Sequence, residues 1–210
     1  MSREIRIYPD HYAENPFEAW DQVSTVVYTS TGYTLGSLHV SSYEDFLIDK
    51  LHEAGHEEYD DEGYEVIGDL SLDELLDRFS RYYWYWPVYA YIHGMATVSM
   101  GPFLCSWDSG QSGFSFISKE THPDEAQARQ IAKNELEVFD HWLQGNCYRF
   151  EVFEDGEWAD SCCGFYGNDF ENNGLLELAG DAGDVDRVYL MREETATRWV
   201  IDEELAELAA

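Results

Sequence analysis

The stretch WYWPVYAYIHGMATVSMGPFLCSWDSGQSGFSFIS, residues 84–118, decides the fold. Across its 35 positions it has one charged side chain, Asp108. Aromatic and β-branched residues dominate it, as is typical of strands that pack against a core. Apolar runs at residues 88–92, 96–100 and 114–117 are separated by a turn at Gly94 and a glycine-flanked loop. This stretch therefore predicts the central antiparallel strands of a sheet.

The flanking sequence predicts that helices pack on one face of this sheet, which makes the fold class α+β. Apolar residues at helical spacing predict three helices and a short acidic one at the end of the chain, at residues 42–54, 71–83, 124–144 and 202–210. Short runs with the composition of strands flank them, at residues 4–8, 24–29, 147–153, 158–166, 185–191 and 199–201. We expect a single domain over residues 1–210, with residues 42–83 as an acidic helical insertion.

The chain is strongly acidic. Its 43 acidic and 12 basic residues give a net charge of −31, and only three of the basic residues are lysines. Such a surface repels nucleic acid and anionic membranes, and attracts basic proteins. Hydrophobic residues make up 44% of the chain, enough for a sizeable core, so disorder is a poor interpretation.

The acidic residues are densest between Glu44 and Asp77, where 14 of them stand against one lysine, a net charge of −13. We call residues 42–54, 57–65 and 71–83 the acidic belt. Its polar helix faces and its loop are expected to face solvent and to bind a partner. The expected partner-binding residues are Glu53, Glu57, Glu58, Asp60, Asp61, Glu62, Glu65, Asp69, Asp73 and Asp77.

Cysteine usage and hydropathy predict a cytoplasmic protein of a host cell. The four cysteines form no CxxC pair, and reduced thiols are expected. Residues 1–10 lack the apolar stretch of a secretory leader, and no apolar run reaches the length of a membrane span.

His52, Glu53 and His56 match the H-E-x-x-H pattern, in which two histidines one helical turn apart bind zinc and the glutamate acts as a base. That chemistry needs a helix that continues through both histidines. Gly55 and the polar run after it predict that the helix ends between them. We therefore expect no metal, no cofactor and no catalytic residue, and keep a zincin-like hydrolase as an alternative.

The WDSGQ segment, residues 107–111, is a second candidate site. Asp108, Ser109 and Gln111 could bind a small ligand from a loop between two strands. The favoured interpretation is structural, with Asp108 capping backbone N–H groups and Gly110 at positive φ. The aromatic run at residues 82–86 could stack on nucleic acid, but it has few basic neighbours. A core or a homodimer interface is the better interpretation of that run.

Four segments together resemble an uncharacterised family of accessory proteins from bacteriophages, plasmids and conjugative elements. They are YPDHYAENPFEAWDQVSTVVY with the following GYTLG, PVYAYIHGMATVSMGPFLCSWDSGQSGFSFISKE, NELEVFDHWLQGNCYRFEVFE, and SCCGFYG. The resemblance covers residues 5–37 and 87–167, and WDSGQ and FYG are its most specific parts. This chain differs in having Ser37 after GYTLG, where the family has Asp, and in its residues 42–83. The resemblance implies a genomic context rather than a chemistry.

Charge and resemblance together predict a non-enzymatic counter-defence protein that mimics DNA. It would inhibit a basic nucleic-acid-binding host protein of the restriction or CRISPR type, with no direct contact with nucleic acid or membrane. A halophile-adapted accessory protein is an alternative, because scarce lysine and abundant acid are also what a salt-loving host produces. A structural or assembly role is a further alternative.

Overall fold

The computed structural model describes residues 2–105, 107–180, 185–195 and 198–206, and its strands and helices confirm the α+β class. The strands form two five-stranded sheets rather than one. The chain divides into two compact units: a terminal unit, residues 1–19 and 141–210, and a central unit, residues 20–140. The central unit contains residues 42–83. That these residues are an insertion into a single domain stays a prediction.

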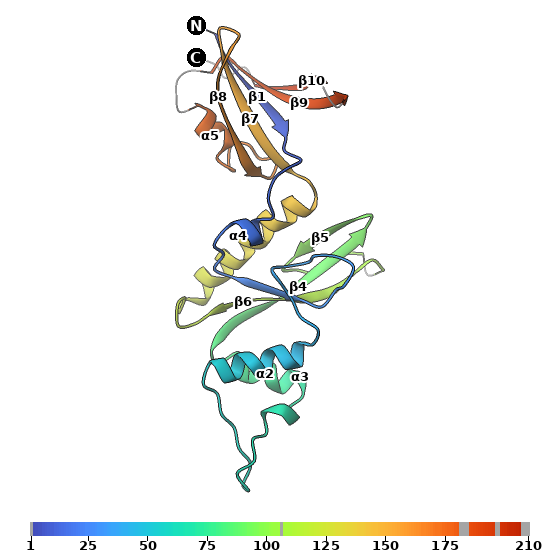
Figure 1. Ribbon diagram of the computed structural model, residues 1–210, viewed down its shortest axis with the longest axis vertical. Helices are drawn as coiled ribbons and strands as arrows, with labels where there is room; N and C mark the ends of the chain where they lie inside the picture. The colour runs from blue at the N-terminus through green and yellow to red at the C-terminus, as the bar shows by residue number, and fades with distance from the viewer. Residues whose placement is uncertain (1, 106, 181–184, 196–197, 207–210) are drawn as a thin grey trace. The chain divides into compact units, whose positions relative to one another are not determined.

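The terminal unit is built on a mixed sheet with strand order β10-β9-β1-β7-β8. Its strands are β1 (Arg3–Pro9), β7 (Cys147–Glu154), β8 (Glu157–Tyr166), β9 (Arg187–Thr195) and β10 (Arg198–Ala206). β1 pairs antiparallel with β7 and parallel with β9, which brings the two ends of the chain into one sheet (Figure 1). The unit also contains α1 (Pro16–Ala19) and α5 (Leu175–Gly180). Leu175 of α5 is fully buried in a core with Ile7 and Phe150.

The central unit has the strand order β3-β2-β6-β4-β5. Its strands are β2 (Thr25–Tyr28), β3 (Leu38–His39), β4 (Tyr83–His93), β5 (Met95–Ser99) and β6 (Ser109–Ser118), and its helices are α2 (Tyr43–Glu53), η1 (Ile67–Asp69), α3 (Leu72–Phe79) and α4 (Glu125–Leu143). The last residues of α4 belong to the terminal unit. β4, β5 and β6 confirm the strands predicted from residues 84–118.

Both faces of the central sheet are covered by helices, whereas one covered face was expected. Because side chains alternate along a strand, Phe114 and Phe116 of β6 pack in the core with α2 and α3, while Ile117 packs in the core with α4. The aromatic run at residues 82–86 divides in the same way: Tyr83 and Tyr85 pack toward α2 and α3, and Trp84 and Trp86 toward α4. The run therefore packs against these two cores, with Trp86 buried and the other four side chains half-buried.

Two element predictions are corrected. The expected helix at residues 202–210 is strand β10 as far as Ala206, because it pairs with β9; residues 207–210 lie outside the described part of the chain. The helix expected over residues 71–83 ends at Phe79, since Tyr83 pairs with Ser118 as the first residue of β4.

Candidate protein-interaction surface

Helices α2 and α3 form the frame of the acidic belt, and they lie side by side against the sheet (Figure 1). Leu47, Leu51 and Phe79 are fully buried between them and the aromatic face of β6. Ser42 caps α2, its side chain accepting a hydrogen bond from the Asp45 amide. At the start of α3, Ser71 and Glu74 form the capping box. The polar faces of both helices are therefore held by a rigid core.

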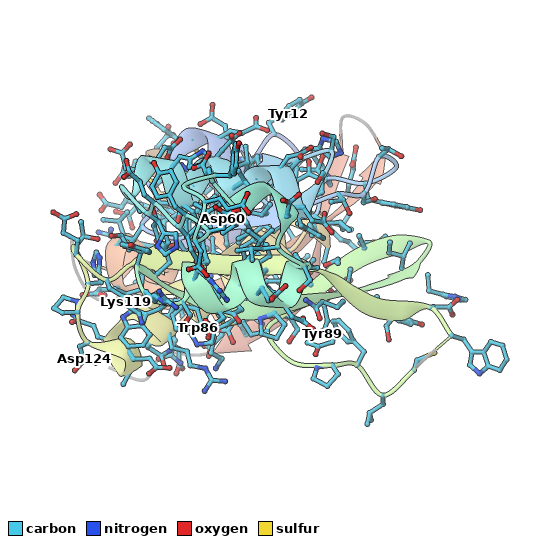
Figure 2. All side chains as sticks on the ribbon, turned by 90° about the horizontal axis from the view of Figure 1, so that it is seen from below. Tyr12, Asp60, Trp86, Tyr89, Lys119 and Asp124 are labelled. Carbon is cyan, nitrogen blue, oxygen red and sulfur yellow. The ribbon has the colours of Figure 1, made fainter. Side chains whose placement is uncertain are left out.

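Residues 57–65 form a small hairpin rather than an irregular loop. A β-bridge joins Tyr59 to Glu65, and the Asp60 carboxylate accepts hydrogen bonds from the amides of Glu62 at 2.9 Å and Tyr64 at 2.8 Å. Figure 2 looks toward this hairpin from below and labels Asp60. Tyr59 and Tyr64 are 55% and 68% exposed. We call residues 57–65 the acidic hairpin.

An ion-pair network ties the acidic hairpin to α3. Both oxygens of Glu58 accept hydrogen bonds from the Arg78 guanidinium, at 3.1 and 3.0 Å. His56 is buried, with Nδ1 3.0 Å from the Tyr82 hydroxyl and Nε2 3.4 Å from Glu58. The hydrogen bonds from Arg78 lower the pKa of Glu58 from its ordinary 4.5 to about 2. Glu58 is therefore a structural residue of the hairpin.

Six of the ten predicted partner-binding residues interact through their side chains with a neighbouring residue in the described ranges, and four do not. Five have hydrogen-bond or ion-pair partners within the belt: besides Glu58 and Asp60, Glu53 pairs with Lys50, Glu65 with His52, and Asp77 with Arg78 and Arg81. Glu57 lies close enough to Tyr59 to raise the pKa of its hydroxyl. The other four are exposed and make no ion pair or side-chain hydrogen bond within the described part of the chain; they are Asp61, Glu62 and Asp73 in the belt, and Asp69 in η1, which joins the acidic hairpin to α3. These four are the carboxylates most available to a partner.

Only part of this division could be predicted from the sequence. Exposure of the carboxylates was predicted from the polar helix faces and the polar loop, and nine of the ten are exposed, while Glu58 is half-buried. The role of Glu58 could not be predicted, because its partner Arg78 is 20 residues away. In EEYDDEGYE, Tyr59 and Tyr64 stand among the acids, and this pattern could have indicated the hairpin.

The H-E-x-x-H histidines face different partners. α2 ends at Glu53 and Gly55 has φ of +73°, which confirms the predicted helix end. His52 is exposed with Nε2 2.9 Å from Glu65, whereas His56 turns into the core toward Tyr82. Over the residues that the structure describes, no cluster of three or more His, Cys, Asp or Glu could hold a metal ion. The geometry therefore gives no support to a zincin-like site.

The WDSGQ segment is mostly strand. Ser109 and Gln111 lie in β6, paired with Tyr91 and Tyr89, and Gly110 between them does not have positive φ. This corrects both the loop and the predicted turn, because backbone pairing with β4 extends β6 to Ser109. The Ser109 hydroxyl donates to the Cys105 carbonyl, and Gln111 donates to the Gly113 carbonyl at 3.3 Å.

Asp108 lies just before the strand, with its carboxylate 3.4 Å from His93 Nδ1 and its carbonyl accepting from the Ile92 amide. Asp108, Ser109 and Gln111 thus each have a local partner, and their contacts do not outline a ligand site.

The chain finds no match among protein-family models, curated proteins or solved structures. The resemblance to accessory proteins of mobile elements therefore stays a prediction. Within the described ranges, every helix is too short or too polar to cross a membrane.

Proposed function

We propose that the protein binds a basic, nucleic-acid-binding host protein through the acidic belt and occupies the site where nucleic acid would bind. The observation that carries the proposal is the concentration of charge. Residues 44–77 have a net charge of −13, within a total of −31 for all 210 residues. Duplex DNA presents one negative charge per about 1.7 Å of its axis, and basic grooves bind it largely by releasing counterions. A dense set of exposed carboxylates can present negative charge to such a basic groove in the same way.

Rigidity of the frame supports mimicry over simple solvation. The belt helices are capped and packed on a buried aromatic core, and the acidic hairpin is held by Asp60 and by the pair of Glu58 with Arg78. Because the backbone that carries the carboxylates is already in place, less conformational entropy is lost when a partner binds. A surface whose acids only keep the protein hydrated would not need a fixed backbone. The biological role proposed is counter-defence by a phage or mobile element against a restriction or CRISPR protein, without enzymatic activity.

The proposal is tested by removing the four available carboxylates together, as Asp61→Asn, Glu62→Gln, Asp69→Asn and Asp73→Asn. The partner is first captured from host lysate and identified. Association is then measured by surface plasmon resonance at several salt concentrations. Because charges at an interface steer encounter, the variant is expected to associate about tenfold more slowly at low salt and to show a weaker salt dependence.

A matched control separates belt charge from total charge. Glu120, Glu157, Glu171 and Glu177 are exposed and lie outside the belt. Changing all four to Gln removes the same number of charges. At physiological salt the Debye length is about 8 Å, so charges outside the contact are largely screened, and association is expected to change there by less than about twofold. Equal slowing in both variants would mean that the partner senses net charge only, and mimicry through the belt would be wrong.

A further inference from the structure

A pocket of about 370 Å³ lies in the central unit, at the point where β2 ends and β3 begins. Its walls come from the two strand ends and from the loop between them, residues 29–37. The residues that line it are Tyr28, Ser30, Thr31, Gly32, Tyr33, Thr34 and His39. None of them belongs to the acidic belt.

The pocket is preformed. β2 and β3 pair in parallel with Tyr28 opposite His39, and the two rings meet edge to face with centroids 5.3 Å apart. The loop is fastened to β2 at its far end, where the Ser37 hydroxyl accepts from the Val26 amide at 2.8 Å and the Ser37 amide donates to the Val26 carbonyl at 3.0 Å. Gly36 is needed there because a Cβ would stand 2.5 Å from the Val26 carbonyl oxygen. Both ends of the loop are therefore held in place before a ligand binds.

The lining is uncharged apart from the titratable His39. Aspartate, glutamate, lysine and arginine are all missing from the lining residues, although 26% of the chain consists of these types. A cation would find no carboxylate in the pocket to pair with. An anion would have to approach a chain with a net charge of −31, which repels it. The charge pattern thus favours a neutral ligand.

The groups that remain define the chemistry of that ligand. Ser30, Thr31 and Thr34 each offer a hydroxyl that can donate and accept hydrogen bonds. Tyr33 is 44% exposed and offers an aromatic face with a polar tip. A sugar ring has hydroxyls around its rim and C–H groups on its faces, so it can use both kinds of group.

We propose that this pocket binds the ring of an uncharged sugar. The Tyr33 face packs against the C–H groups of the ring, and the hydroxyls of the loop bond to its rim. Because the pocket is open and supplies few anchoring groups, the affinity for a single sugar unit is in the millimolar range. The proposal is independent of the acidic belt and of its partner.

The experiment is an NMR titration of the ¹⁵N-labelled full chain with D-glucose, D-galactose and D-ribose. Sodium phosphate and ethylammonium chloride serve as the anionic and cationic probes. The expected result is saturable shifts of amide signals from residues 28–39 with at least one sugar, and none there with either charged probe. Absence of saturable shifts with all three sugars, or saturable binding of phosphate or ethylammonium in the pocket, would overturn the proposal.

Variants test the roles of ring and hydroxyl separately. Tyr33→Ala should weaken sugar binding about tenfold, or 1.4 kcal/mol, whereas Tyr33→Phe, which keeps the aromatic face, should retain most of it. Thr34→Val removes one hydroxyl at nearly constant shape and should weaken binding as well. Tyr12→Ala removes a tyrosine that is 94% exposed elsewhere in the chain, and is expected to change nothing. Equal effects of Tyr33→Ala and Tyr12→Ala would contradict the assignment.

Discussion

Glu58 illustrates how single acidic residues differ within a chain that has 43 of them. It accepts two hydrogen bonds from Arg78 and lies 3.4 Å from His56, so it joins the acidic hairpin to α3. Most of its acidic neighbours could be neutralised at little cost, but this one holds the hairpin in place. A variant in which Glu58 is replaced together with the other hairpin acids would therefore lose both the charge and the structure of the hairpin, and the two effects could not be separated.

The first prediction concerns the titration of Glu58. Because Arg78 lowers its pKa in the folded protein from 4.5 to about 2, the folded state binds this proton less readily than the unfolded chain. The stabilisation is therefore complete above pH 4.5 and disappears as the pH falls toward 2. Carbon-detected NMR should find the Glu58 carboxyl titrating near pH 2, and Glu58→Gln should lose stability relative to wild type at pH 6 but not at pH 2. A titration midpoint near 4.5 would show that the pair with Arg78 does not form in solution.

At the scale of elements, the break in the apolar stripe of α4 has a structural cause. Glu135 interrupts the apolar stripe of the predicted helix. Its two carboxylate oxygens accept hydrogen bonds from the amides of Val23 and Ser24, both at 2.8 Å, just before β2 begins. Asp140 does the same for β5, accepting from the Val98 amide and the Thr97 hydroxyl. These two acids fasten α4 to the strands of the central sheet.

Replacing Glu135 therefore has a predictable cost. Glu135→Ala leaves two amides without their acceptor, and hydrogen bonds to a charged group contribute about 1.5–3 kcal/mol each, less where water can replace the carboxylate. Because Val23 is exposed, we expect a loss of about 2 kcal/mol in the free energy of unfolding, measured by urea denaturation. Glu137→Ala, on the exposed face of the same helix, should cost less than about 0.5 kcal/mol. Similar losses for both variants would mean that Glu135 acts only through helix propensity.

The elements that could be predicted are those with local signals. Ser42 and Gly55 mark the ends of α2, and Asp155-Gly156 marks the turn between β7 and β8. β10 was missed because residues 202–206 have the composition of a helix, and pairing with β9 overrides that preference. The parallel pairing of β1 with β9 joins strands about 180 residues apart, and no local pattern encodes it. In the candidate site, exposure of the acids was predictable because it follows from local patterns. The contacts of His56 with Tyr82 and of Glu58 with Arg78 were not, because they join residues that are distant in the sequence.

At the scale of the whole molecule, the charge must be reconciled with a stable fold. A net charge of −31 destabilises any compact state through self-repulsion. The two units oppose this with large apolar cores, in which Phe79, Phe139 and Phe150 are among the largest fully buried side chains. A halophilic protein would instead depend on salt to screen its charge.

This contrast gives a prediction about salt. At about 0.01 M salt the Debye length grows to about 30 Å, so repulsion between the carboxylates is at its strongest. We expect the protein to remain folded there, with its near-ultraviolet circular dichroism unchanged from that at physiological salt. Loss of that signal at low salt, and its return when salt is added, would favour adaptation to a saline host over mimicry.

Competition between DNA and this protein for the captured partner tests the central claim most directly. The partner is immobilised, and binding of the wild-type chain is measured with increasing concentrations of duplex DNA at fixed salt. If the acidic belt occupies the nucleic-acid site, the duplex should displace the protein completely, and the apparent dissociation constant of the protein should rise in proportion to the duplex concentration. A partner that holds the duplex and the protein at the same time, with neither affinity changed, would contradict the claim.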